Sequence, residues 1–423
     1  MKTIEKKYLL PFILITSCFA LWGFANDITN PMVKSFSKIF RMSVTQGSLV
    51  QVAFYGGYFC MALPAALFIK RFSYKTGILM GLGLYALGAL MFLPAASIGS
   101  YWPFLAAYFI LTCGLSFLET SANPFILSMG DPDSATRRLN LAQSFNPIGS
   151  LCGMFVAMSY IQARMNPLST AERATLDEAQ FDALKVADLA VLVKPYAAIG
   201  IVLIAIFILI AITRIQVKKP AMEGQSTAFG PSVKRLFSNK AYCEGVVTQF
   251  FYVGAQITCW TFIIQYGTRV FMAEGMAEQD AEILSQRLNI VAMVLFCCCR
   301  FVSTALMKKF RPASMLATFA AVAILLTGIV ILVPGRVGVY ALVGVSACMS
   351  LMFPTIYGLA LKDVGSDAEI GSAGLIMAIL GGSLLPPLQA MIIDSGHTAG
   401  SFIVPLVCFV VVLIYGIRRK ANV

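Results

Sequence analysis

Two acidic residues lie inside long apolar stretches, where a charged side chain is costly. Glu119 sits within an apolar run that reaches from about Tyr101 to Leu127, and Asp27 closely follows Trp22 in the first such run. A charge at the centre of a membrane helix costs at least ~2.5–3.5 kcal/mol on insertion scales, so such a residue is a functional candidate by default. The other acids can be placed in loops or at helix ends. Glu119 and Asp27 are therefore the residues whose chemistry must be explained first.

A carboxyl group that can be shut off from water can bind and release a proton. Loss of water raises the pKa of a carboxyl group from its reference value near ~4. An acid that is neutral when occluded and charged when open to water can couple proton entry to solute entry. One proton moving inward supplies ~2.3 kcal/mol per 100 mV. We predict this coupling role for Glu119 and Asp27; the alternative is a structural ion pair, for which Arg300 is the one basic residue well inside an apolar stretch.

Polar side chains recur at helical spacing in four of the apolar stretches. These stripes contain Asn26, Asp27 and Asn30; Ser116, Glu119, Thr120 and Asn123; Asn140, Gln143 and Asn146; and Gln249, Tyr252 and Gln256. Residues three or four apart share one face of a helix. Amides donate and accept hydrogen bonds, carboxylates accept them from neighbouring hydroxyls, and aromatic rings cover the C–H face of a sugar. The stripes predict a sugar-binding cavity to which Asn26, Gln249 and Gln256 contribute, although interhelical hydrogen bonding explains any single amide about as well.

The elements that must position these residues are membrane helices. Of the 423 residues, 58% are hydrophobic and only 12% are charged, which is too little charge to cover the surface of a soluble protein of this size. Apolar stretches of about 20 residues recur along the chain and do not alternate as barrel strands would. We predict an all-α polytopic membrane protein with twelve transmembrane helices in two six-helix bundles. The expected spans are about 8–32, 47–69, 76–97, 102–128, 139–162, 190–213, 242–268, 286–307, 313–333, 337–361, 370–393 and 400–418.

The distribution of charge sets the expected orientation and the domain boundaries. The net charge is +12, and the basic clusters fall at the termini and in alternate loops, as the positive-inside rule requires. We therefore expect both termini in the cytoplasm of a bacterium, an N-terminal bundle at 1–213, a cytoplasmic linker at 214–240 and a C-terminal bundle at 241–423. The same distribution argues against a nucleic-acid partner. The expected partners are the lipid bilayer and a small solute, and we expect a monomer in the inner membrane.

Several kinds of chemistry are not supported by the sequence. The eleven cysteines lie almost entirely in apolar stretches without metal-ligand spacing, and His397 is the one histidine. We expect no metal, no cofactor other than the coupling proton and no enzymatic activity, because no nucleophile–base pair is visible. The residues up to Cys18 imitate a lipoprotein cleavage site, but the apolar run continues past Phe24 and favours a first membrane helix.

At the residues singled out above, the chain resembles the fucose:proton symporter family of the major facilitator superfamily. The matching stretches are 26–28, 51–59, 118–125, 138–146, 249–256, 300–301 and 353–356. The resemblance covers nearly the whole chain, and the motifs are specific when taken together. It implies twelve helices and the uptake of a monosaccharide with a proton by alternating access.

The resemblance also implies roles for individual residues. Asp27 would engage the sugar and take part in coupling, and Glu119 would be the acid that binds the proton. Gln143 and Asn146 would contact sugar hydroxyls, and Phe353 would line the pocket from the C-terminal half.

The identity of the sugar depends on a few positions. Related glucose and galactose transporters tend to carry Gln at position 119, so Glu119 favours L-fucose. Phe353, however, stands where the fucose transporter of the family carries Tyr, the loop 69–75 lacks the usual Asp and Gly, and Cys299 replaces a usual Gly. The alternatives are a glucose/galactose or N-acetylhexosamine symporter of the same family and, less well supported, a non-transporting sugar sensor or a membrane enzyme.

Overall fold

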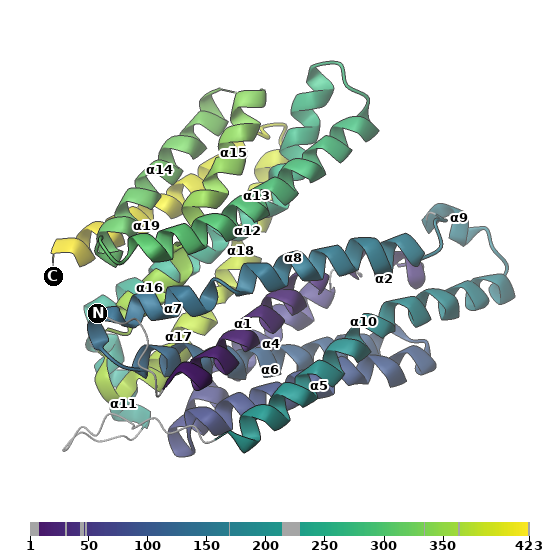
Figure 1. The fold of residues 1–423 in the computed structure, drawn as a ribbon. Coiled ribbons are helices and arrows are strands. Elements are labelled where there is room, and N and C mark those ends of the chain that lie inside the picture. Colours follow the sequence, from purple (N-terminus) through teal and green to yellow (C-terminus); the bar gives the residue numbers. More distant parts are fainter. Residues whose placement is uncertain are drawn as a thin grey trace. The chain divides into compact units, whose positions relative to one another are not determined.

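A computed structural model describes residues 8–29, 32–42, 46, 49–168, 170–213, 229–333, 335–362 and 364–421, which are almost entirely helical (Figure 1). The first half of the chain contains α1 (Leu9–Thr29), α2 (Met32–Ile39), α4 (Leu49–Arg71), α5 (Tyr74–Ile98), α6 (Tyr101–Ser128), η2 (Pro132–Ser134), α7 (Ala135–Gln143), α8 (Asn146–Val156), the π-helical η3 (Ala157–Gln162), α9 (Thr170–Ala174) and α10 (Glu178–Ile212). The second half contains α11 (Phe229–Ser238), α12 (Lys240–Ala273), α13 (Glu278–Leu306), α14 (Pro312–Leu332), α15 (Arg336–Met349), α16 (Met352–Ala360), η4 (Gly365–Asp367), α17 (Ala368–Met377), η5 (Ala378–Leu380), α18 (Gly381–Asp394), η6 (Gly400–Phe402) and α19 (Ile403–Ala421).

Eleven helical segments within the described residues are long and apolar enough to cross a membrane. They correspond to eleven of the twelve predicted spans. The remaining prediction, at 139–162, is helical but divided: α7 ends at Gln143, α8 begins at Asn146, and the π-helix η3 continues to Gln162. A continuous helix was predicted here, but a turn at Ser144 and Phe145 interrupts it. The break lies within the third predicted polar stripe.

Two further spans are interrupted in the same way. Ser350 and Leu351 separate α15 from α16, and η5 separates α17 from α18. Glycine and proline residues accompany the second interruption, since Gly381, Pro386 and Pro387 lie in α18. A broken helix leaves backbone groups without partners in its own ladder, so other groups must satisfy them.

The chain divides into two compact units, and each is described by itself. One unit consists of 7–125 and 148–218. Within it α5 lies alongside α10 (Figure 1). The backbone of α8 closely approaches that of α1 at Gly149 and Gly153. A Cβ atom at Gly149 would lie 1.7 Å from the backbone oxygen of Ala20, so this approach requires a glycine.

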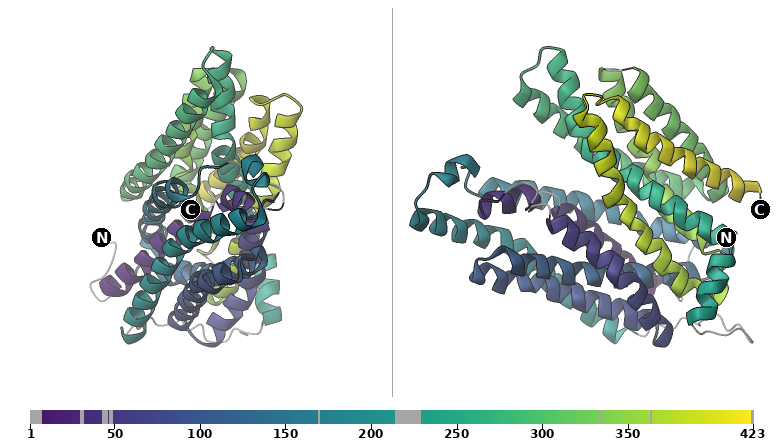
Figure 2. Two further views of the ribbon diagram at one scale, coloured as in Figure 1. Left: turned by 90° about the vertical axis from the view of Figure 1, so that its right-hand side faces the viewer. Right: turned by 180° about the vertical axis from the view of Figure 1, so that it is seen from behind.

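The other unit consists of 1–6, 126–147 and 219–423. Helix α12 is at its centre and packs against α13, α15, α16, α18 and α19, and the rear view in Figure 2 shows α18 and α19 close to α12. The short α7 belongs to this unit and packs on α13 and α16. The predicted boundaries at 213 and 241 stay a prediction, and residues 214–228 of the expected linker lie outside the described residues.

The long loop expected at 163–189 is more ordered than the sequence indicated. Residues 178–189 form the start of the 35-residue helix α10. Asp188 in this segment is buried and pairs with Arg173 of α9 at 2.7 Å. This ion pair connects α9 to α10.

Candidate functional site

Glu119 lies at the centre of a buried polar cluster in the first unit. It is on α6 and is 1% exposed, and neither carboxyl oxygen has a hydrogen-bond partner of acceptable geometry among the described residues. The hydroxyl of Tyr58 on α4 is its electrostatic neighbour, and the indole of Trp22 on α1 is close to that hydroxyl. These two groups also lack regular hydrogen-bond partners among the described residues. We define Trp22, Tyr58 and Glu119 as the acid cluster.

Hydroxyl groups on α6, the helix of Glu119, bond to backbone carbonyl oxygens. The hydroxyls of Thr112 and Ser121 are bonded to the carbonyl oxygens one turn earlier, at 2.8 and 2.5 Å, and so are satisfied within the helix. Ser116, one turn before Glu119, donates instead to the carbonyl oxygen of Tyr58 at 3.1 Å. This bond holds α4 against α6 at the level of the acid.

Asp27 is half-buried on α1 and has a different neighbour. Its carboxyl group interacts electrostatically with the hydroxyl of Tyr55 on α4. Tyr55 precedes Tyr58 by three residues. Residues three apart share a helix face and differ by ~4.5 Å along the axis. The tyrosine neighbours of Asp27 and Glu119 are therefore offset by this distance along α4. Asn26 is also half-buried, whereas Asn30, the last residue of this predicted stripe, lies outside the described residues.

The remaining predicted site residues belong to the second unit. Gln249 on α12 is fully buried, and its amide has no hydrogen-bond partner among the described residues. Gln256, two turns later, is half-buried. Phe353 on α16 is 8% exposed and packs between Tyr252 and Tyr357, with ring centroids 6.4 Å from each. This part of α12 and α16 therefore combines the unpaired amide of Gln249 with aromatic rings.

Gln143 is held in place through its backbone. It is the last residue of α7, and its carbonyl oxygen accepts a hydrogen bond from Arg300 at 3.0 Å. The same guanidinium donates to the carbonyl oxygen of Ser350, at the break between α15 and α16, and lies over the ring of Phe296. Arg300 thus satisfies carbonyl groups at two helix breaks. This was not foreseen, because the sequence offered it as a partner for an acid.

Further bonds connect α7 to its neighbours in this unit. The amide of Asn140 donates to the hydroxyl of Thr355 at 3.2 Å, and Ser144 lies 3.4 Å from Thr304. Asn146, the first residue of α8, is half-buried. In the polar stripe predicted at 140–146, Asn140 and Gln143 are therefore buried, and Asn146 is half-buried.

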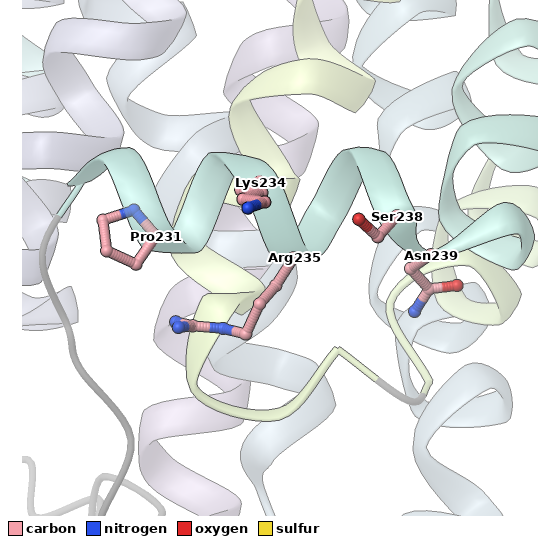
Figure 3. Close-up of a pocket in the computed structure, with 5 residues that line it drawn as sticks. All are labelled: Pro231, Lys234, Arg235, Ser238 and Asn239. Carbon is pink, nitrogen blue, oxygen red and sulfur yellow. The ribbon is translucent and has the colours of Figure 1, made fainter.

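A hollow on the surface of α11 does not involve the predicted site. It is lined by Pro231, Lys234, Arg235, Ser238 and Asn239 (Figure 3). Arg235 extends from the helix and donates two hydrogen bonds of 2.7 Å to Asp367, and this carboxylate raises the pKa of the guanidinium. No cluster of three or more potential metal ligands occurs in the described ranges.

Sequence reasoning missed three residues of the acid environment: Trp22, Tyr55 and Tyr58. The signal was present, because the two tyrosines are three apart within one of the stretches that carried the family resemblance. An aromatic residue in an apolar helix is normally a packing residue, and only the position of the carboxyl groups distinguishes these from the others. The structure places the eight predicted site residues in two groups, with Asn26, Asp27 and Glu119 in one unit and the rest in the other.

Comparison with known proteins identifies the family. Residues 15–379 match the model of the Major Facilitator Superfamily. The chain belongs to this superfamily. The match confirms the predicted fold, an all-α membrane protein of twelve helices in two six-helix bundles, and the chain is a multi-pass membrane transporter.

The relatives of this superfamily member are similar over nearly their full lengths. The L-fucose-proton symporter of Haemophilus influenzae is 50% identical, with 99% of this chain and 98% of the relative covered. The L-fucose-proton symporter of Escherichia coli is 35% identical (98% and 94% covered), and the glucose/galactose transporter of Brucella abortus is 31% identical (98% and 95%). These names agree with a transporter and not an enzyme.

Similarity to solved structures extends over nearly the whole chain. The crystal structure of the major-facilitator transporter FucP in the outward conformation is 34% identical, covers 98% of this chain and 99% of that chain, and has a TM-score of 0.89. The resemblance to the fucose:proton symporters drawn from the sequence motifs is thus confirmed.

Proposed function

We propose that this transporter carries L-fucose together with a proton into the cell by alternating access. Two relatives that are similar over almost the whole chain are named L-fucose-proton symporters. The observation in the structure that supports proton coupling is the carboxyl group of Glu119, which is buried without an ion-pair or regular hydrogen-bond partner among the described residues. A carboxyl group in that position is costly to ionise, so it gains from binding a proton whenever the site is closed.

The proposed roles follow from the positions of the residues. Glu119 binds the coupling proton, and Asp27, which is half-buried, binds the sugar and takes part in coupling. Asn26, Gln143, Asn146, Gln249 and Gln256 supply hydrogen bonds to sugar hydroxyls, and Phe353 covers the apolar face of the ring. We propose no cofactor besides the proton.

Uptake into membrane vesicles tests the function directly. Vesicles that contain the protein should accumulate radiolabelled L-fucose when an inward proton gradient is imposed, and the accumulation should collapse when a protonophore is added. A failure to take up any 6-deoxyhexose or hexose would exclude the proposal.

The variant Glu119→Gln tests the role of the acid. Gln has nearly the same shape but cannot ionise, so proton-driven accumulation should fall at least tenfold while exchange of labelled for unlabelled sugar persists. Asp182→Asn is the matched control, because Asp182 is an exposed acid paired with Lys185 outside the proposed site. Equal loss of accumulation and exchange in Glu119→Gln would remove this residue from the coupling role.

A glucose or galactose substrate is the second candidate. The observation in its favour is the 31% identity to a glucose/galactose transporter. Phe353 also agrees with this candidate, because it lacks the hydroxyl group that the resemblance to the fucose transporter implies at this position. Competition by L-fucose, L-galactose, D-arabinose, glucose and galactose in a single uptake assay distinguishes the two. Stronger competition by glucose than by L-fucose would favour the second candidate.

We propose that both termini face the cytoplasm and that the protein is a monomer in the bacterial inner membrane. The basic residues Arg418 and Arg419 at the end of α19 support the orientation, since cytoplasmic ends of membrane helices are rich in Lys and Arg. A fluorescent protein fused to the C-terminus should fold and fluoresce, whereas alkaline phosphatase at that position should be inactive. The reverse result would invert the topology.

A further inference from the structure

An apolar groove runs along the surface of the first unit, away from the acid cluster. It has a volume of about 740 Å³ and lies between α1, α8 with its continuation η3, and α10. Its lining is apolar along most of its length, with Ile148 38% exposed and Val202 46% exposed. None of the predicted sugar-binding or proton-binding residues lines it. An apolar groove on a membrane-spanning unit suits hydrocarbon better than water.

The length of the groove matches one leaflet of a bilayer. Its lining extends from Ile148 to Tyr160 on one wall and from Lys194 to Ile206 on the other, and each distance corresponds to a rise of roughly 18 Å. The hydrocarbon core of a bilayer is ~30 Å thick, so one leaflet accounts for about half of that. A single acyl chain can therefore lie along the groove from the interface to the middle of the membrane.

One end of the groove is cationic. Lys194 is exposed and lines the groove at this end, although its helix is otherwise strongly apolar there. Tyr160 lines the groove opposite, and the guanidinium of Arg164 lies 4.2 Å from the centre of the Tyr160 ring. Lys and Arg near the end of a membrane helix place their charges at the level of the lipid headgroups. An apolar groove that ends at two cations is complementary in shape and charge to an anionic phospholipid.

The backbone around the groove explains why it remains open. Gly149 and Gly153 bring α8 against the backbone of α1, and the small side chains of Cys152 on α8 and Ala198 on α10 line the groove. The π-helical turn η3 then shifts the direction of the side chains beside Tyr160. Such π-helical insertions are often found at functional sites.

We propose that this groove binds one anionic phospholipid, with an acyl chain along α8 and α10 and its phosphate at Lys194. The lipid would contact Leu21 and Phe24 on α1, the helix that also carries Trp22 of the acid cluster. The occupant would thereby support the helix on which the proposed sugar-binding Asp27 lies. The proposal does not depend on which sugar is transported.

Native mass spectrometry of the full-length protein tests the proposal, with phosphatidylglycerol as the probe. One molecule per chain should be retained, and Lys194→Gln should weaken its apparent affinity about fivefold, as expected for the loss of one interfacial cation. Ala198→Trp, which fills the groove on α10, should abolish retention. The matched controls on the same helix are Lys185→Gln and Ile201→Trp, since neither side chain lines the groove.

A second measurement uses a cysteine in the groove. Cys152 is exposed and lines it, so phosphatidylglycerol should slow the reaction of Cys152 with a maleimide but not that of the exposed Cys60 and Cys298. Diacylglycerol with the same chains serves as the arm without phosphate and should bind at least fivefold more weakly. Equal binding of diacylglycerol would overturn the headgroup assignment. Equal effects of the control variants, or no lipid retained at one copy per chain, would overturn the site.

Discussion

Two buried acids in one unit have opposite surroundings. Asp188 pairs with Arg173 at 2.7 Å and accepts a hydrogen bond of 2.9 Å from the backbone of Asn166. Glu119 has neither kind of partner among the described residues. A paired buried charge stabilises a structure only in its ionised form, whereas an unpaired carboxyl group can change its protonation without breaking a contact. Asp188 therefore suits a structural role and Glu119 a cycle of proton binding and release.

Phe353 gives a prediction about specificity at the same scale. Phe353→Tyr would add a hydrogen-bond donor to the ring that packs beside Tyr252 and Tyr357 at the proposed sugar site. A typical hydrogen bond contributes about 0.5–1.5 kcal/mol, so the half-saturation concentration for L-fucose should fall about two- to tenfold. Uptake kinetics for L-fucose and glucose measure this change.

The control for this substitution is Phe109→Tyr, which adds a hydroxyl to a side chain that is 37% exposed on α6. It should leave both sugars unaffected. A shift of equal size for L-fucose and glucose in Phe353→Tyr would mean that Phe353 does not distinguish between them.

At the scale of elements, interrupted helices are the main feature that positions the site. The breaks after Gln143 and at Ser350 expose carbonyl groups within the apolar part of the protein, and Arg300 on α13 donates to both. One side chain thus joins three helices, α7, α13 and α15. The orientation of Gln143 and of the start of α16, which carries Phe353, depends on this arrangement.

Removal of Arg300 should therefore destabilise the protein strongly. In Arg300→Met the apolar part of the side chain is largely retained, but two buried carbonyl groups lose their donors. Each unsatisfied carbonyl group should cost about 1–3 kcal/mol of stability. The midpoint of thermal unfolding in detergent should fall by several degrees, and Arg300→Lys should recover only part of the loss because Lys lacks the fork of donors.

Arg336→Met is the control, since Arg336 pairs with Glu274 and both side chains are largely exposed. Exposed ion pairs contribute about 0–1 kcal/mol, so its midpoint should hardly change. If Arg300→Met unfolded at the same temperature as this control, the carbonyl groups at the breaks would have other donors.

At the scale of the whole molecule, the fold could be predicted and the breaks could not. Hydropathy fixed eleven spans because each is a continuous apolar run, such as Pro312–Leu332 of α14. The run at 139–162 is less apolar and was predicted as one span, yet it is divided at Ser144 and Phe145. Hydropathy does not detect such a break, because its stability depends on Arg300, which is distant in the sequence.

The candidate site was predictable to a similar extent. Charge inside an apolar run identified Glu119 and Asp27 without any contact being known. The neighbouring Tyr55 and Tyr58 were not identified, because the sequence does not indicate which group an aromatic residue in an apolar helix contacts. The pairing of Arg173 with Asp188 was missed for the same reason, since both residues have the sequence surroundings of an exposed helix.

The number of protons carried with each sugar is a property of the whole molecule. Glu119 is 1% exposed and Asp27 is half-buried, so one site is shut off from water and the other is partly open to it. We expect one proton for each sugar. A potential of 100 mV supplies ~2.3 kcal/mol per proton, which limits the accumulation of a neutral sugar to roughly forty- to fifty-fold.

Vesicles clamped at a series of potassium diffusion potentials measure this limit. With one proton, the logarithm of the limiting accumulation should rise by one unit for every ~60 mV, and two protons would double that slope. Asp27→Asn should not change the slope if the variant still accumulates sugar, because Asp27 would take part in coupling through the sugar that it binds and would not itself carry a proton across. A doubled slope that falls to the single value in Asp27→Asn would show instead that both acids carry a proton in each cycle.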